Sequence, residues 1–343
     1  MGLRLKKNLT IKFIGYLIFL TVIPLLVVGL ISLRVSTEIL TEESRVFTIE
    51  VVKEQREYLD LQLEQVENLI ANISGVEEIT EALLEGESFD TYTNLATQAR
   101  IGYILNGYLN LRGLLSIDIF TEGGNQYHVG DTLNIDNIRV DVKDRIYEEA
   151  LASDKNVLWT GIEDNVNGNS AEEKVLTAAK ILKRTDRESL EQIPVGMLLV
   201  NYSVTDIYER FSRINLGEGS YLMVVDAKGR IIYHPNQSFL GSQISPVFIE
   251  KLTSDDGILS TDVGGEEMFI TYAYSSKSNW YVMSLIPANT FTAKTSLIRT
   301  VTFSLLAICF CFAGIAAILI TQNIVNPILK ITDQFRSFQE GTL

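Results

Sequence analysis

The chain has 343 residues, enough for two or three domains, and 46% of them are hydrophobic. Its formal net charge is −14, and all but two of its 43 acidic residues lie within residues 35–298. Because such an acidic region repels phosphates, nucleic acid is excluded as a partner. The region contains no cysteine, so disulfides cannot form there, and this absence favours a prokaryotic source.

Two uncharged apolar segments are long enough to cross a membrane. Residues 13–33 and 301–320 contain no charged side chain, and at 1.5 Å per residue each helix would span about 30 Å, the thickness of the hydrocarbon core. We predict transmembrane helix 1 at residues 13–33 and transmembrane helix 2 at residues 299–321. The first segment is alternatively a cleaved signal peptide, but it is longer than such a segment usually is, and no small-x-small cleavage site follows it cleanly.

The distribution of basic residues gives the expected orientation. Residues 1–12 form a basic tail, and the positive-inside rule places this tail in the cytoplasm. Two spans then return residues 322–343 to the same side and leave residues 34–298 outside. We therefore predict a multi-pass protein of the bacterial plasma (inner) membrane, embedded in the lipid bilayer, with an extracytoplasmic central domain and both termini cytoplasmic.

A long helix is expected at the start of the central domain. Residues 34–85 contain no proline and no glycine before Gly75. Apolar residues recur there with steps of 4, 3, 4 and 3, at Leu59, Leu63, Val66, Ile70 and Ile73. This spacing places them on one side of a helix. The seam either packs against the helix's own domain or also pairs with a second subunit of a homodimer.

Beyond residue 112 the pattern changes to short β-type runs with turn signals. One set of strands is expected at residues 114–120, 126–129, 157–159, 175–182 and 195–201. A second set is expected at residues 221–225, 230–233, 258–261, 267–274 and 280–286. Helices are expected at residues 142–152, 204–213 and 246–252. This order predicts two α+β modules that follow the long helix.

An internal repeat supports the two modules. Residues 120–128 align with residues 226–234 at a constant offset of 106, and both read as a strand, a turn with Gly123 or Gly229, and a second strand. The two histidines of the chain, His128 and His234, fall at equivalent places. A metal pair is the alternative, but no further His or Cys lies nearby, so a role in the hairpin strands is favoured and no metal is expected.

Three stretches resemble a double Cache sensor domain: residues 116–124 (SIDIFTEGG), residues 223–235 (MVVDAKGRIIYHP) and residues 278–287 (SNWYVMSLIP). The resemblance implies a long helix at residues 34–85, a membrane-distal module at residues 86–203 and a membrane-proximal module at residues 204–298. The implied fold class is α+β, with two PAS-like antiparallel-sheet modules on a long N-terminal helix. Two transmembrane helices and a C-terminal coiled-coil helix would flank them.

Residues 322–343 resemble the first half of a HAMP relay domain. The motif's proline, apolar seam and closing glycine match Pro327, Ile328, Ile331, Phe335, Phe338 and Gly341. With Ile324, the apolar residues again step by 4, 3, 4 and 3, and such a stripe in water needs a partner helix. We therefore expect a parallel coiled coil across a homodimer; a lone amphipathic helix beside the membrane is the alternative.

The sequence contains no catalytic motif that we recognise. It has no phosphate loop, no HExxH, no nucleophile elbow and no CxxC, so we expect no enzyme activity in this chain and no cofactor. Residues 163–168 imitate the start of a calcium loop, but the twelfth position is Lys174 rather than glutamate. A polar surface turn is therefore favoured there.

The resemblance implies that the distal module holds a small ligand. Amino-acid sensors of this family carry Arg-x-Trp-Tyr and, later, an aspartate on a strand. Residues 144–147 read Asp-Arg-Ile-Tyr, and Asn201 stands at the aspartate's place. A neutral amide loses the charge-assisted hydrogen bond to an ammonium group, so we expect this protein not to be a typical amino-acid receptor.

The predicted ligand site consists of Tyr127, Arg145, Tyr147 and Trp159, together with Asn201. Aromatic walls and one arginine would suit a small organic ligand, including an anionic one. The alternative is that the aromatic residues are core and Arg145 is solvated.

These observations predict a homodimeric transmembrane receptor. It would bind a small extracytoplasmic ligand and relay a conformational change through transmembrane helix 2 and the HAMP helix to a cytoplasmic output domain that this sequence does not contain. That domain could be a histidine kinase, a diguanylate cyclase or a chemoreceptor signalling domain. The alternative is a membrane-anchored extracytoplasmic interaction module with no output of its own.

Overall fold

The computed structural model describes residues 2–84, 91–185, 190–252 and 254–339. The chain divides into two compact units: Met1–Val46 with Asn289–Leu343, and Phe47–Ala288. Among the described residues, the first unit is helical and the second holds the β-strands. We call them the helical unit and the sheet unit.

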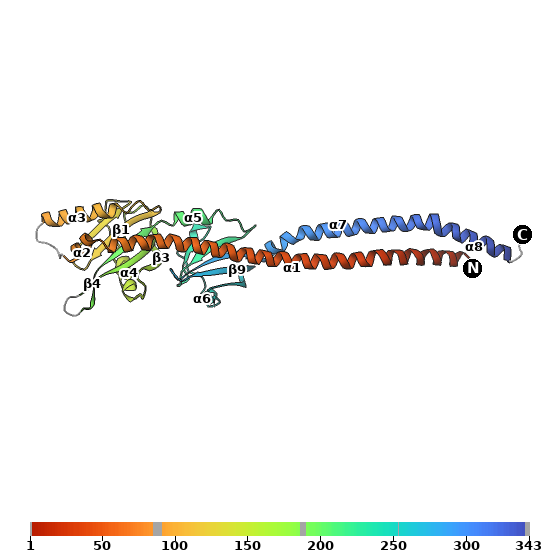
Figure 1. Ribbon diagram of the computed structural model, residues 1–343, viewed down its shortest axis with the longest axis horizontal. Helices are drawn as coiled ribbons and strands as arrows, with labels where there is room; N and C mark the ends of the chain where they lie inside the picture. The colour runs from red at the N-terminus through yellow and green to blue at the C-terminus, as the bar shows by residue number, and fades with distance from the viewer. Residues whose placement is uncertain (1, 85–90, 186–189, 253, 340–343) are drawn as a thin grey trace. The chain divides into compact units, whose positions relative to one another are not determined.

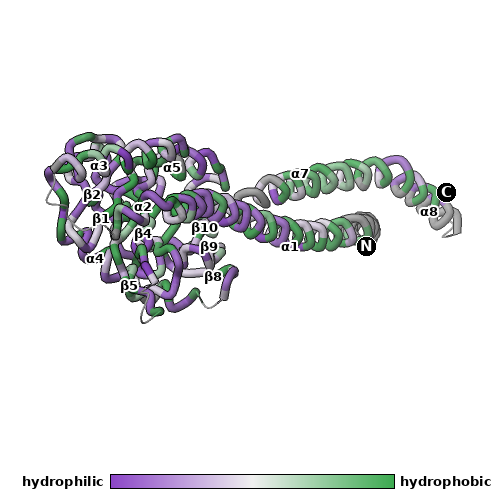
Figure 2. The backbone as a smooth tube through the Cα atoms, turned by 60° about the vertical axis from the view of Figure 1, so that its left-hand side comes forward, coloured by the Kyte–Doolittle hydropathy of each residue, from purple (hydrophilic) through white to green (hydrophobic). Residues whose placement is uncertain are grey.

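Two helices of the helical unit have the composition of membrane spans. The long helix α1 (Gly2–Ser74) begins in this unit, and α7 (Ala288–Ile320) ends in it. The segments Ile23–Ser74 and Ile298–Thr332 are long and apolar enough to cross a membrane, and their most apolar stretches are not buried within the protein. In Figure 2, most of the coloured part of α7 is green, the colour of hydrophobic residues.

An irregular turn follows α7. One π-helical turn, Thr321–Val325 (η2), separates α7 from α8 (Asn326–Gln339). Pro327 is the second residue of α8 and has no backbone N–H to donate to the helical turn that precedes it. The turn begins at residue 321, the last residue of the predicted transmembrane helix 2.

The predicted relay stripe lies on α8 and the preceding turn. Ile324, Ile328 and Ile331 are each more than half exposed within the single chain. Phe335 and Phe338 belong to α8, but their side chains are not among those described, and Gly341 lies outside the described residues.

The sheet unit begins with the module that we call the first module. After α1, the chain forms α2 (Glu77–Leu84) and α3 (Thr91–Asn106). It then builds an antiparallel sheet in the order β2-β1-β5-β4-β3. The strands are β1 (Leu114–Thr121), β2 (Gln126–Gly130), β3 (Leu158–Asp164), β4 (Lys174–Thr185) and β5 (Gln192–Tyr202). Helix α4 (Val140–Ala152) lies between β2 and β3 in the chain.

The second module repeats this topology. Helix α5 (Thr205–Phe211) leads to an antiparallel sheet in the order β7-β6-β10-β9-β8. Its strands are β6 (Tyr221–Val225), β7 (Ile231–Tyr233), β8 (Asp256–Val263), β9 (Glu266–Ser275) and β10 (Trp280–Pro287). Two short helices, η1 (Gln237–Phe239) and α6 (Pro246–Ile249), lie between β7 and β8. The predicted fold class, two PAS-like antiparallel sheets after a long N-terminal helix, is confirmed.

The internal repeat corresponds to the hairpins β1–β2 and β6–β7. Tyr127 and Tyr233, which are equivalent in the repeat, are both buried. The predicted turn glycine is correct in the second hairpin, where Gly229 has a positive φ of 79°. In the first hairpin Gly123 lies in the turn, as predicted, and the left-handed conformation is taken by the next residue, Gly124, with φ 86°.

The apolar seam of α1 packs against the sheet unit itself. Leu59, Leu63, Val66, Ile70 and Ile73 are all at most 2% exposed, and Figure 1 shows α1 running alongside both modules. Burying an aliphatic side chain contributes about 1.5–3 kcal/mol, so this seam fixes the helix to its own domain. A second subunit would have to pair through other residues.

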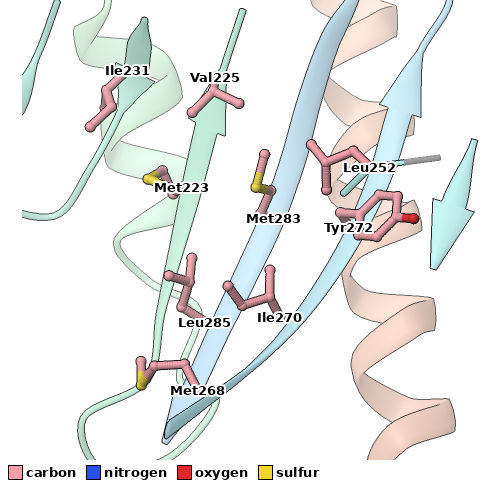
Figure 3. Packing of buried hydrophobic residues seen from close by; sticks show 9 residues of the cluster. All are labelled: Met223, Val225, Ile231, Leu252, Met268, Ile270, Tyr272, Met283 and Leu285. Carbon is pink, nitrogen blue, oxygen red and sulfur yellow. The ribbon is translucent and has the colours of Figure 1, made fainter. Parts of the chain in front are cut away.

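Each module has its own hydrophobic core. In the second module the core side chains come from β6, β7, β9 and β10 and from Leu252, and Figure 3 shows them gathered on one face of the sheet. In the first module, α4 places Val142, Ile146 and Ala150 against apolar residues of β4 and β5. Each module is therefore stabilised by a core of its own.

Candidate functional site

A row of buried polar side chains crosses the sheet of the first module. Antiparallel partners share a face of the sheet, and the register pairs Thr177 with Asn201, Asn201 with Ser116, and Asp118 with His128. The same register pairs Asp118 with Leu199, which packs against α4. We call these five residues the polar row; they lie on the α4 face of the sheet.

Hydrogen bonds link the whole polar row. Thr177 Oγ1 donates to Asn201 Oδ1 (2.8 Å), and Asn201 Nδ2 donates to Ser116 Oγ (2.9 Å). Ser116 Oγ donates to one oxygen of Asp118 (2.8 Å), and the other lies 2.6 Å from Nδ1 of His128. Burying a polar group without a hydrogen-bond partner costs free energy. Each side chain of the polar row has such a partner, so the buried row is compatible with a stable fold.

The polar row ends at a loop. His128 Nε2 lies 2.9 Å from the carbonyl oxygen of Thr132, in the loop between β2 and α4. This loop is tied to the loop between β3 and β4, because Ser170 Oγ donates to Asp131 (2.6 Å) and the Arg139 guanidinium donates to the Asn165 carbonyl (3.1 Å). A change in the polar row can therefore reach both loops.

The two histidines of the chain have opposite pKa shifts. Burial lowers the pKa of His128, but the hydrogen bond to Asp118 and that carboxylate's charge outweigh burial and leave the pKa raised. Burial lowers the pKa of His234, which packs edge-on against Tyr221 and Phe239. His128 therefore favours the charged form in the folded state, and His234 the neutral form.

The pH dependence of two variants tests these shifts. A histidine whose pKa is higher in the folded than in the unfolded state stabilises the fold. This stabilisation is complete below about pH 6.5, the pKa of histidine in the unfolded chain. It is lost as the pH rises through the pKa of the folded state. Urea unfolding between pH 5 and 9 should show that His128→Gln destabilises most at acidic pH. His234→Gln should show the reverse trend, because its lowered pKa penalises the folded state on acidification. The same pH dependence of stability in both variants would contradict opposite pKa shifts for His128 and His234.

The predicted site residues are divided between helix α4 and the two faces of the first module's sheet. Asn201 belongs to the polar row, and Arg145 and Tyr147 lie on α4. Tyr127 pairs with Ile119, and Trp159 with Ala178; these positions belong to the opposite face of the sheet. Trp159 Nε1 donates to Glu67 of α1 (3.0 Å).

On α4, both predicted side chains have protein partners. The hydroxyl of Tyr147 donates to Glu122, and burial together with this carboxylate raises the pKa of Tyr147 to about 12. Arg145 Nη2 donates to Glu163 (2.7 Å). Whether these side chains contact a ligand stays a prediction.

A buried ion cluster joins the two modules. Glu163 on β3 is 4% exposed and receives hydrogen bonds from Arg145 and, at 2.6 Å, from Arg230 of the second module. Arg230 also donates to Asp226 (2.7 Å) and to the carbonyl oxygen of Thr160. Burial raises the pKa of Glu163, but the two guanidinium groups outweigh it and leave the pKa lowered, so Glu163 is ionised.

The local backbone allows this close approach. Gly161 has a φ of 84°, and a Cβ there would lie 2.8 Å from the Asp226 carboxylate. The register of β3 against β4 shifts between Trp159 and Ile162. The bulge turns Trp159 towards α1 and Glu163 towards α4.

A second contact between the modules involves Lys155, which follows α4. Its ammonium donates to the carbonyl oxygens of Ser276 (2.8 Å) and Lys277 (2.6 Å) and to Asn279 Oδ1 (3.0 Å). Nearby, Trp159 packs edge-on against Trp280, with ring centroids 6.0 Å apart. Together with the ion cluster, these contacts form what we call the junction.

Sequence reasoning missed most of the residues that make the polar row and the junction. Residues 163–168 were expected to form a polar surface turn, but this is wrong: Glu163, Asn165 and Asn167 are each at most 4% exposed. The signal available for the polar row was Ser116 and Asp118 at alternate positions of an otherwise apolar strand. The sequence alone does not indicate that these two side chains point into the protein.

Comparison with known proteins identifies the family. A family model for the Cache domain matches residues 36–295. The chain belongs to the Cache domain family. The predicted resemblance of residues 35–298 to a Cache sensor domain is therefore confirmed, whereas the HAMP resemblance of residues 322–343 stays a prediction. Cache domains are sensory rather than catalytic.

A curated relative of this Cache chain is the sensor histidine kinase YesM of Bacillus subtilis (strain 168). It is 22% identical over 293 residues, which cover 85% of this chain and 48% of YesM. The chain thus spans about half the length of this relative.

Solved structures show the same Cache fold. The ligand-binding domain of the Pseudomonas fluorescens chemoreceptor CtaA, in complex with L-isoleucine, has a TM-score of 0.53 at 14% identity and covers 76% of this chain and 98% of its own. The ligand-binding domain of the Pseudomonas aeruginosa PAO1 amino acid chemoreceptor PctB, in complex with L-Arg, has a TM-score of 0.52 at 16% identity and covers 74% and 92%.

Proposed function

We propose that this chain is the sensing part of a transmembrane receptor whose first module binds a small organic ligand at the polar row. The observation that carries the proposal is the hydrogen-bonded path from Asn201 through Asp118 and His128 to the carbonyl of Thr132. A ligand that replaces one of these hydrogen bonds alters the loop that precedes α4. Sensing needs such a difference between the free and bound states.

The charges of the polar row limit the ligand's chemistry. Its carboxylate, Asp118, already has one oxygen bonded to Ser116 and the other to His128. Asn201 offers a neutral amide. An α-ammonium group, as in the L-isoleucine of the CtaA complex, would find no free carboxylate in the row, so we infer a ligand that is anionic or rich in hydroxyl groups. Arg145 and Tyr147 on α4 would contact it, whereas Tyr127 and Trp159 lie on the opposite face.

The junction provides the route to the second module. Arg145 and Glu163 belong to the first module and Arg230 to the second. A displacement of α4 would therefore move Arg145 and change the ion pairs that Glu163 makes with both arginines. In the second module, Trp280 lies on β10, which ends at Pro287, and α7 begins at the next residue. The proposed relay therefore passes from the junction to α7 and then to α8.

The remaining parts of the proposal concern the membrane and the partner subunit. Residues 13–33 and 299–321 span the bacterial plasma membrane, with both termini in the cytoplasm and residues 34–298 outside. Residues 322–343 act as a HAMP helix that pairs in a homodimer through the exposed stripe with Ile328 and Ile331. The output domain would be a histidine kinase, as in the relative YesM.

A thermal-shift screen tests ligand binding. The full chain in detergent is heated with panels of carboxylates, sugars, amines and amino acids. A ligand at a concentration of 100 times its Kd stabilises the folded protein by about 2.7 kcal/mol. The melting temperature of the protein therefore rises measurably. We expect a hit among carboxylates or sugars that Asn201→Ala abolishes. The matched control, Asn110→Ala, changes an exposed asparagine and should keep the shift. Hits confined to α-amino acids would contradict the inferred ligand class.

A further inference from the structure

A cavity lies in the first module, away from the polar row. It has a volume of about 310 Å³ and lies between the end of α1, α2, the segment after α4 and parts of β4 and β5. This volume suits a small molecule. The residues that line it include no member of the polar row and none of the five predicted ligand residues. Any ligand of this cavity would therefore occupy a different site.

The lining of this cavity is cationic although the domain is acidic. Lys155, Lys180 and Lys183 line it, and no aspartate or glutamate is among the described residues that do. The ammonium of Lys155 is held by oxygens of the second module. Lys180 and Lys183 therefore supply the positive charge that remains available to a ligand.

Lys180 is an unusual lysine. Its side chain is half-buried, and its ammonium makes no hydrogen bond or ion pair with the residues that the structure describes, although its backbone pairs with Leu198 in the sheet. Burial alone lowers its pKa, with no carboxylate raising it. A desolvated ammonium without a partner is unfavourable. An anion bound in the cavity would provide the negative charge that pairs with it.

Neutral donors lie beside the two lysines. Ser153 Oγ accepts from the Lys155 N–H, so its own O–H can donate elsewhere. The side-chain amide of Gln192 donates one hydrogen to Thr185 and has a second one available. On its β3 side, β4 is paired up to Ala179, whereas on its β5 side it is paired up to Thr185. The cavity thus lies along an open strand edge.

We propose that this cavity is a binding site for a small organic anion, with carboxylate or phosphate groups held by Lys180 and Lys183. The site goes beyond the proposed function because it shares no residue with the polar row. Lys155 lines the cavity and also holds the β9–β10 turn, so a bound anion lies next to one contact of the junction.

Isothermal titration of the full chain in detergent with citrate and with inorganic phosphate tests the proposal, with sodium chloride keeping the ionic strength constant. We expect saturable binding of at least one probe, weakened at least ten-fold by Lys180→Met. Lys251→Met, which changes an exposed lysine of the second module, should leave the affinity unchanged. Binding of citrate alone would assign a carboxylate ligand, and binding of phosphate alone a phosphate. No saturable binding, or equal affinity in Lys180→Met, would overturn the proposal.

A melting curve of Lys180→Met without added anion is the second measurement. Methionine keeps most of the side-chain length but removes the desolvated ammonium, so the variant should melt at the same temperature as the wild type or higher. A markedly lower melting temperature would overturn the proposal, because Lys180 would then be stabilised by the protein itself. Such a result would not affect the proposed ligand site at the polar row, because Asn201→Ala tests that site separately.

Discussion

Replacing Arg230 with alanine is expected to lower the free energy of unfolding by about 3 kcal/mol, near the lower end of the range for breaking a buried ion pair. The substitution removes the guanidinium that bonds Glu163, Asp226 and the Thr160 carbonyl. Glu163 keeps Arg145, and Asp226 keeps backbone N–H donors from Lys228 and residue 230. The loss should therefore not reach the upper end of the range.

Thermal unfolding of the full chain measures this loss. For a domain of this size, 3 kcal/mol corresponds to about 6–12 °C in melting temperature. Arg112→Ala is the matched control, because Arg112 pairs with Glu209 on the surface, where ion pairs contribute about 0–1 kcal/mol. A loss for Arg230→Ala no larger than that of the control would show that the ion cluster does not hold the modules together.

Asn201→Asp is expected to destabilise the first module by several kcal/mol at pH 7.5, because it places a carboxylate in the buried polar row. The Asn201 side chain is fully buried and donates to Ser116 Oγ. An ionised aspartate cannot donate, so it would leave Ser116 Oγ facing a carboxylate oxygen. Asn110→Asp, at an exposed position, should change stability by less than about 0.5 kcal/mol.

The destabilisation by Asn201→Asp should shrink as the pH falls. Burial raises the pKa of the new carboxyl above its unfolded value of about 3.9, so the protonated form is favoured in the folded state. The folded variant then binds a proton more readily than the unfolded one, and its stability relative to the wild type rises on acidification. Urea unfolding at pH 5 and 7.5 checks this; a loss independent of pH would mean that the polar row is open to water.

Local patterns in the sequence predicted most of the fold, but the single helix expected over residues 34–85 is wrong: it is interrupted at Gly75, between α1 and α2. The a/d seam of α1, the alternating strands and the repeated hairpin each depend on residues close together in the chain. Helix α3 was not predicted, because its apolar residues do not form a clear helical stripe. Among its described side chains, Ile101 and Leu105 are the fully buried ones.

The candidate site depended on contacts that no local pattern shows. Glu163 is buried because it meets Arg230, 67 positions further along the chain. Trp159 points to α1 because a bulge at Gly161 changes which residues of β3 share a face. Tyr147 and Asn201 were selected from the family resemblance, and their hydrogen-bond partners, Glu122 and Ser116, became visible only in the folded chain.

Hydrogen–deuterium exchange of the full chain, with and without a ligand from the thermal-shift screen, tests the central claim most directly. The account predicts slower exchange of backbone amides in β1, β5 and α4 and in the loop at Thr132, with a smaller change at the junction strand β3. Protection confined to the second module, with these segments unchanged, would contradict a ligand site at the polar row.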